Sequence, residues 1–299
     1  DKTLNFTWDN KKLSGFEGDS LASALLANNI GIVGRSFKYH RPRGIFSSGV
    51  EESGALVTIG SKDRRDPNVR ATTQELFDGL KASGQNAFPN VNFDLGGINN
   101  YIGRFFAAGF YYKTFMGIPP FEWGKGTTIW MLFEKLIRKA AGMGSASRLP
   151  DPDSYEHAHD VCDVIVVGSG PSGVAAAIEA AEKKLDVILV EQDSLVGGNQ
   201  LSENDFSTSK IFNQLKSLGI KVMTRTTAFG LYDNCVVGLL ERVTDHLSIP
   251  DSTLPRQRFW TIRAKHIIVG SGALERHIAF NNNDIPGVMT VNASKHYLN

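Results

Sequence analysis

The sequence predicts an α/β protein in which a Rossmann-like domain follows a small β-grasp-like module. Three observations support this fold class. A strand–helix–strand pattern with a G-x-G-x-x-G turn occupies residues 161–200, a hairpin–helix–strand pattern opens the chain, and an aromatic-rich stretch without clean periodicity separates the two. We therefore expect a β-grasp module over residues 1–84, a connector over 85–160, and a dinucleotide-binding domain over 161–299 that is incomplete at its C-terminus.

The composition excludes several classes of protein. The 299 residues carry 32 basic and 31 acidic side chains, and a net charge of +1 gives no electrostatic case for a nucleic-acid partner. No apolar stretch has the length of a membrane span and the start lacks signal-peptide character, so we expect a cytoplasmic protein. The only two cysteines, Cys162 and Cys235, exclude a disulfide framework and a cysteine-ligated cluster. The chain starts at Asp1 and stops in mid-pattern at Asn299, and we expect a piece of a longer protein.

The predicted β-grasp elements follow in order. Residues 3–16 alternate apolar and polar side chains on either side of a turn at residues 9–11, which predicts a β-hairpin. The run SLASALLAN then predicts a helix with Asp19 as its N-cap, and its final asparagines suit a helix end. Residues 56–59 and 69–77 are predicted to add two strands.

A basic loop lies inside this module, at residues 34–54. Its cations could bind a phosphate or an acidic surface of a partner protein. The simpler interpretation is a loop whose charges are only solvated. No cysteine, histidine or carboxylate lies near His40 in the sequence at the spacing of metal ligands. The cations of the loop are Arg35, Lys38, His40, Arg41 and Arg43.

The connector carries most of the aromatic side chains. We expect them to pack against a domain or a partner, and ordinary core packing is the alternative. Residues 130–141 are a plausible short helix, and residues 151–159 look like a polar linker. His157 and His159 in that linker could share a metal, but a solvated linker is favoured, and we predict no metal site.

The strand–helix–strand unit carries the strongest signal. Residues 164–167 and 185–190 are apolar strands around an alanine-rich helix at residues 172–184. In the motif, the first glycine permits a tight turn, the second lets the backbone approach a pyrophosphate, and the third allows close helix–strand packing. The helix N-terminus favours phosphates. Glu191 ends the second strand, where a carboxylate can accept both ribose hydroxyls and repel a 2′-phosphate, so NAD or FAD is favoured over NADP.

Further glycines follow this unit. Gly197 and Gly198 suit a close approach of backbone to pyrophosphate, and Gly270 and Gly272 suit a similar approach at the carboxyl edge of the sheet. The remaining predicted elements are a helix at 206–218, a parallel strand at 220–224, a β-meander at 228–232, 236–242 and 259–263, and a strand at 266–269.

Some segments also resemble a known family. GSGPSG, EQDSLVGG and IIVGSGALER resemble the flavoproteins with two dinucleotide-binding domains. RSFKYHRPRGIFSSGVEESGALV, AGFYYKTFM, YEHAHDVCDVIVVGSGPSG and NNNDIPGVM closely resemble the alpha subunits of heterotetrameric sarcosine oxidases. This second resemblance extends over essentially the whole chain.

The resemblance implies a function that composition alone does not. It implies a ferredoxin-like first module without its [2Fe–2S] cluster, because the cluster cysteines that relatives keep in the loop at 35–55 are missing here. It implies NAD in the dinucleotide domain, FMN at the contact with a beta subunit, and FAD with the amine-oxidising site in that subunit. Gamma and delta subunits complete the complex, which demethylates sarcosine with folate as acceptor. The folate-binding part of such a subunit is absent from this chain.

The motif positions shared with this family give the expected cofactor contacts, and no catalytic residue is expected on this chain. The contacts are Gly168, Gly170, Ser172, Gly173, Glu191, Gln192, Asp193, Gly198, Asn199 and Ala228.

Three functions stay open at this point. The chain is part of an oxidoreductase subunit acting on CH–NH donors and inactive alone, or a non-catalytic module with structural NAD, or a stand-alone FAD/NAD(P)H reductase. The third normally needs a redox dithiol or a second complete dinucleotide motif, and the sequence has no C-x-x-C. The amine substrate, the choice between NAD and FAD, and the oligomeric state are left open.

Overall fold

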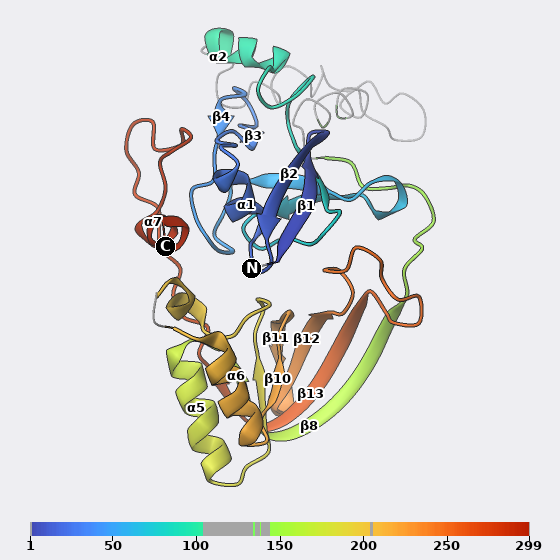
Figure 1. Cartoon of the computed structure of the whole chain (residues 1–299), viewed down its shortest axis with the longest axis vertical. Helices are drawn as coiled ribbons and strands as arrows, with labels where there is room; N and C mark the ends of the chain where they lie inside the picture. Colours follow the sequence, from blue (N-terminus) through green and yellow to red (C-terminus); the bar gives the residue numbers. More distant parts are fainter. Residues whose placement is uncertain (1, 104–133, 135–137, 139–143, 204–205, 299) are drawn as a thin grey trace, which may run out of the picture.

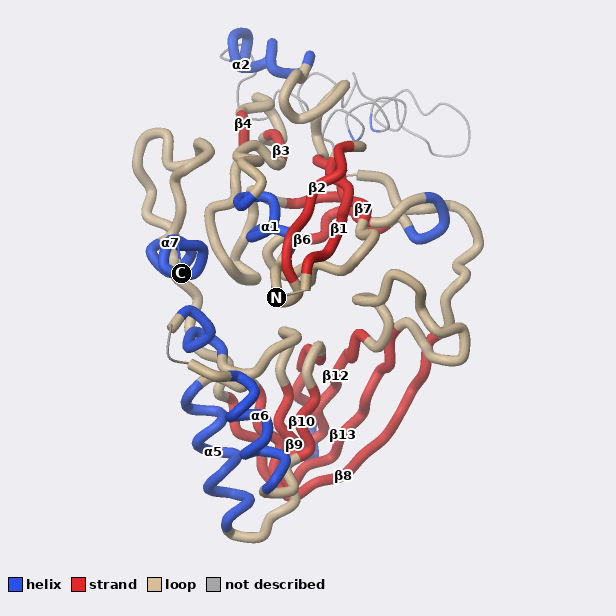
Figure 2. Tube along the Cα trace, viewed as in Figure 1, coloured by secondary structure: helices blue, strands red, loops and turns tan. Residues whose placement is uncertain are grey.

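The computed structural model describes residues 2–103, 134, 138, 144–203 and 206–298 (Figure 1). Most of the aromatic connector, including the helix expected at residues 130–141, lies outside these described residues. Two sheets organise the described chain, and Figure 2 shows them as separate groups of strands, with helices beside the larger sheet.

The N-terminal module is a mixed five-stranded sheet with the strand order β2-β1-β7-β5-β6. β1 pairs antiparallel with β2 and parallel with β7, as in a β-grasp fold. Helix α1 (Leu21–Ala27) packs Leu21 and Leu25 into a core that includes Phe6 and Trp8 of β1. The strands are β1 (Thr3–Trp8), β2 (Lys11–Phe16), β5 (Leu56–Ile59), β6 (Asp66–Arg70) and β7 (Lys81–Gly84).

Two local predictions in this module are wrong. The strand expected at 69–77 ends at Arg70, because a turn closed by the Thr73 N–H and the Arg70 carbonyl redirects the chain. The N-cap of α1 is Ser20, whose Oγ accepts from the Ser23 N–H at 3.1 Å. Asp19 acts one residue earlier, accepting from the Phe16 N–H and the Ser23 hydroxyl.

The second sheet has six strands in the order β10-β9-β8-β13-β12-β11. β10, β9, β8 and β13 run parallel, and β12 and β11 continue the sheet antiparallel. Helices α5 and α6 bury Ala177 and Leu215 in one cluster with Val166 and Leu189 of the sheet. Other strand residues, including Ile165 and Ile188, belong to a second cluster with β12 and β13. The elements are β8 (Tyr155–Val167), α5 (Pro171–Glu182), β9 (Val187–Val190), α6 (Thr208–Ser217), β10 (Lys221–Met223), β11 (Thr226–Tyr232), β12 (Val236–Arg242) and β13 (Gln257–Val269).

Two strands of this sheet are longer than the sequence indicates. β8 begins at Tyr155, within the stretch expected to be a polar linker, and pairs from there with Gln257 onward in β13. The two strands expected at 259–263 and 266–269 are the continuous strand β13. Both differences arise because polar residues extend these strands by pairing with the neighbouring strand. The sequence of a polar segment does not indicate such pairing.

The C-terminal segment returns to the N-terminal module. Tyr297 of α7 (Val291–Leu298) packs against the core of that module, and its hydroxyl donates to the Ser47 carbonyl at 3.0 Å. The Thr290 N–H donates to the Phe46 carbonyl at 2.7 Å. Among the described residues, no helix is long and apolar enough to cross a membrane. The remaining short elements are β3 (Gly34–Arg35), β4 (Pro42–Arg43), α2 (Asn99–Ile102) and 3₁₀ turns at Lys62–Arg64, Leu95–Ile98, Gly198–Ser202 and Asp233–Cys235.

Candidate dinucleotide site

The turn after β8 places the glycine motif at the carboxyl edge of the sheet. Gly168 has a φ of 99°, and a Cβ there would lie 2.5 Å from the Gly270 carbonyl oxygen. A Cβ at Gly173 would overlap the carbonyl oxygen of Gly168, so α5 begins directly against the turn. Both glycines are therefore required by the packing of the fold itself.

Gly170 differs from its two neighbours in the motif. Among the described residues, no atom beyond its two chain neighbours lies within 4 Å of an ideal Cβ at this position, and its backbone is extended with φ −66°. It is the N-cap of α5, and no side chain among the described residues caps the first turn. Ser172 in that turn is exposed. Pro171 at the first helical position has no N–H, so Ser172 and Gly173 carry the first backbone donors of α5, and the helix dipole favours an anion in front of this turn.

Glu191 follows β9 and is almost entirely buried, with 7% of its surface exposed. Its Oε2 accepts from the Ser169 N–H at 2.9 Å and the Ser169 hydroxyl at 2.6 Å, while Oε1 accepts from the Asp193 N–H at 3.0 Å. A carboxylate offers about four acceptor positions, so this network leaves one, on Oε1. The sequence predicts that Glu191 accepts two ribose hydroxyls, and in the structure the carboxylate has acceptor capacity for one.

The loop after Glu191 is held by two arginines. The Arg242 guanidinium donates to the Gln192 carbonyl at 2.7 Å, and the Arg225 N–H donates to the Asp193 carbonyl at 2.8 Å. Asp193 is exposed by surface area, yet crowding of its carboxyl by neighbouring protein atoms and then the charge of Glu191 raise the pKa of that carboxyl to about 6. The loop therefore presents carboxylates where a nucleotide with a 2′-phosphate would add further negative charge.

The paired glycines face the first turn. A Cβ at Gly198, where φ is 55°, would lie 3.1 Å from the Gly170 Cα, and the Gly197 N–H donates to the Ser169 hydroxyl at 3.2 Å. Contact between the two loops accounts for the small residue at Gly198, where the sequence predicts an approach of the backbone to a pyrophosphate. Asn199 is exposed beside this contact.

Ala228 lies apart from these loops, within β11. Its backbone pairs with Leu239, and its side chain packs against the second hydrophobic cluster of the sheet. The start of the same strand does reach the site, because the Thr226 N–H donates to the Glu191 carbonyl at 2.8 Å. The sequence does not predict the hydrogen bonds that Ser169 and Arg225 make around Glu191. Ser169 lies within the glycine motif, but at a position that the motif leaves variable.

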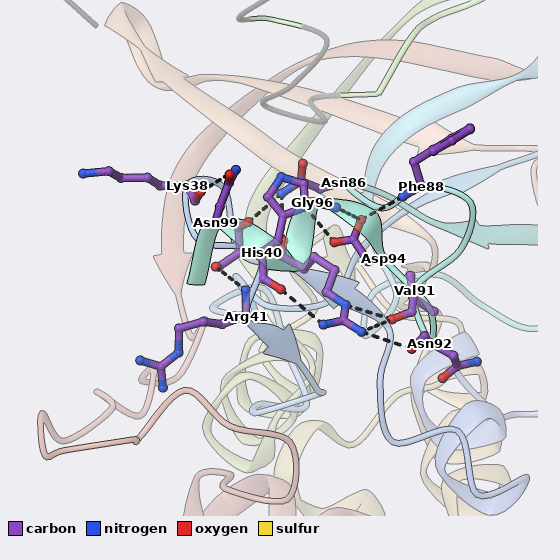
Figure 3. A network of polar contacts seen from close by, with 12 residues as sticks. Lys38, His40, Arg41, Asn86, Phe88, Val91, Asn92, Asp94, Gly96 and Asn99 are labelled. Atoms are coloured by element: carbon purple, nitrogen blue, oxygen red, sulfur yellow. Dashed lines mark hydrogen bonds and ion pairs between the residues drawn. The ribbon is translucent and has the colours of Figure 1, made fainter. Parts of the chain in front are cut away.

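Most of the basic side chains in the loop at residues 34–54 form hydrogen bonds or ion pairs within the chain (Figure 3). The Arg35 guanidinium donates to the Val91 carbonyl at 2.6 and 2.8 Å. His40 Nδ1 lies 2.7 Å from Asp94 Oδ2, and these two side chains are 12% and 1% exposed. Arg41 and Arg43 both pair with Asp284, at 2.8 and 2.6 Å. These four side chains therefore fix the loop to other parts of the chain.

The two histidines of the expected linker lie on β8. Their rings are 4.7 Å apart, and His157 Nε2 lies 3.1 Å from the Thr261 hydroxyl. No group of three or more potential metal ligands gathers anywhere in the described part of the chain. The first module also contains no cysteine, so its residues do not fit a [2Fe–2S] cluster.

Family comparisons divide the chain as the two sheets do. Residues 1–87 match the family described as a 2Fe-2S iron-sulfur cluster binding domain, and residues 163–246 match FAD dependent oxidoreductases. Together with the two sheets, these matches confirm the predicted fold class, a Rossmann-like domain preceded by a ferredoxin-like β-grasp module.

Curated relatives extend this result over the whole chain. The chain is 48% identical to the sarcosine oxidase subunit alpha of Rhizobium meliloti over 99% of its length, and 32% identical to that of Corynebacterium sp. strain U-96 over 100%. The chain is a homologue of sarcosine oxidase alpha subunits. This homologue spans 30% and 27% of the length of those two relatives.

A solved structure supports the same arrangement of the fold. The homologue superposes over its full length on 46% of an L-proline dehydrogenase chain from P. horikoshii, with a TM-score of 0.60 and 21% identity. This likeness shows a shared fold, with both modules present in one chain.

Proposed function

We propose that the chain is the dinucleotide-holding part of an alpha subunit in a sarcosine-oxidase-type complex. Such a complex oxidatively demethylates sarcosine or a related N-methyl amino acid, acting on a CH–NH bond. The proposal rests on 48% identity to a sarcosine oxidase alpha subunit over nearly the whole chain. The single structural observation behind it is the open space at Gly170, in front of the uncapped N-terminus of α5.

The residues present fit an adenine dinucleotide, and we propose NAD. The Gly170 turn and the first N–H groups of α5 would hold the pyrophosphate, while the remaining acceptor on Glu191 Oε1 would take a ribose hydroxyl. Glu191, supported by Asp193, disfavours the 2′-phosphate of NADP. FAD is the second candidate, because residues 163–246 match a family of FAD-dependent oxidoreductases.

The chain's own residues bind and orient, and we assign no chemical step to them. In a flavin-dependent amine oxidase the flavin would accept the hydride of the C–H bond, and the protein would supply orientation and electrostatics. We propose that FAD with the amine site belongs to a beta-type partner, that FMN lies at the contact with it, and that gamma- and delta-type subunits complete a cytoplasmic complex. The relatives' designation as subunit alpha supports partner subunits.

A reconstitution assay tests this assignment. The full-length alpha chain would be produced with and without the partner subunits and supplied with sarcosine, oxygen, FAD and FMN, while peroxide formation is followed. We expect turnover only when the alpha chain and its partners are combined. Sustained turnover by the alpha chain alone would support a self-contained flavoprotein, and equal turnover by the partners without it would remove its role.

A further inference from the structure

The two modules meet at an ion pair beside the dinucleotide loop. The Glu75 carboxylate, from the loop between β6 and β7, accepts from Arg225 Nε and Nη2 at 2.7 Å each. Both side chains are mostly buried, with 16% and 26% exposed. A two-pronged bond of this kind fixes the orientation of the guanidinium as well as its position.

Arg225 also holds the dinucleotide loop through its main chain. Its N–H donates to the Asp193 carbonyl at 2.8 Å, and the next N–H, of Thr226, donates to the Glu191 carbonyl at 2.8 Å. Arg225 has a φ of 53°, a left-handed conformation that is unfavourable for a residue with a side chain. Its side-chain anchor on the first module therefore supports the backbone geometry that the loop depends on.

Arg242 makes a second connection between the same parts. Its guanidinium donates to the Gln192 carbonyl at 2.7 Å and to the Thr73 carbonyl of the first module at 3.4 Å. Its N–H donates to the Arg225 carbonyl at 2.9 Å. Residues 191–193 are thus fastened to residues 73–75 through two arginines.

We infer that Glu75 and Arg225 are positioning residues for the dinucleotide, so that the cluster-free β-grasp module is a structural part of the nucleotide site. The inference rests on the proposed function. A module that only adds stability would need no link to this loop. The chain also has a connection between the two modules that lies away from the loop. Arg64 of the first module pairs with Asp153, just before β8, at 2.6 Å and with no contact to residues 191–193.

The test compares these two connections in the full-length subunit within its complex. Nucleotide-depleted protein carrying Glu75→Gln, Arg225→Gln, both changes, or the control Arg64→Gln would be titrated with NAD by calorimetry, and the Tm of each variant measured. We expect Kd to rise about tenfold in either Glu75→Gln or Arg225→Gln. The double variant should bind like the singles, because the two side chains act as one unit.

The control separates positioning from stability. Arg64→Gln, whose side chain is 44% exposed, should lower Tm less than Glu75→Gln and leave the Kd of NAD within about twofold. An unchanged Kd in Glu75→Gln, with normal binding by the unmodified protein, would overturn the inference and leave the proposed function standing. An equal rise in Kd in Arg64→Gln would also overturn it, since general loosening would then explain the effect. Failure of the unmodified protein to bind NAD would refute the proposed NAD function and the inference with it.

Discussion

Gly170→Ala separates a requirement of the ligand from a requirement of the fold. An ideal Cβ at this position has no described atom beyond the chain neighbours within 4 Å, and φ −66° suits alanine. Alanine restricts the unfolded chain, which stabilises by about 0.4–1 kcal/mol, and is a poorer N-cap than glycine, which costs about 0.5–1 kcal/mol. These effects nearly cancel, so the free energy of unfolding should change by less than about 1 kcal/mol.

Dinucleotide binding should respond very differently. A methyl group at Gly170 would stand where the pyrophosphate approaches the backbone, and overpacking of this kind costs about 1–3 kcal/mol, or roughly 5- to 150-fold in Kd. Chemical denaturation would report stability, and calorimetric titration with NAD would report affinity.

Two other glycines make this experiment decisive. Gly97→Ala, where no described atom beyond the chain neighbours lies within 4 Å of the Cβ, should change neither affinity nor the fold. Gly173→Ala should destabilise the protein outright, because its Cβ would overlap the Gly168 carbonyl oxygen. A Gly170→Ala variant that binds NAD as tightly as the unmodified protein would refute the assignment of the pyrophosphate to this turn.

Three further predictions concern charge and cofactor content. Glu191→Ala should weaken NAD binding by about 1.5–3 kcal/mol. It should also lower Tm, because the Ser169 and Asp193 N–H groups lose their acceptor. Unchanged calorimetric affinity would falsify the ribose contact. Because the folded-state pKa of Asp193 is raised to about 6, ionisation of its carboxyl opposes folding as pH rises from about 4 through 6. Asp193→Asn should therefore raise Tm at pH 7.5 but not at pH 4. The opposite pattern would contradict the desolvation of this carboxyl. Anaerobically purified protein should contain no stoichiometric iron or acid-labile sulfide in its first module, and detection of both there would end that expectation.

Local sequence patterns predict the elements whose signals are short-range. The hairpin, the strand Leu56–Ile59, the helix after the glycine turn and the strand Val236–Arg242 lie where alternation, periodicity and turn residues place them. Each of these elements carries its own pattern of apolar side chains, so no knowledge of distant partners is needed.

The misses arise where distant partners decide the structure. The polar start of β8 is a strand only because β13 pairs with it, and Arg41 and Arg43 of the basic loop pair with Asp284, far along the chain. The link from Glu75 to Arg225 joins residues 150 positions apart. Composition and spacing identify such side chains as charged, but the tertiary fold decides which of them meet.

Native mass spectrometry of the intact complex tests the central claim most directly. Collisional release of the alpha subunit from its partners would show which nucleotide, if any, remains on it. We predict one NAD on each alpha subunit and a lower NAD occupancy in the Gly170→Ala variant. An alpha subunit that carries FAD in place of NAD, or an unchanged NAD occupancy in Gly170→Ala, would contradict the account of the site given above.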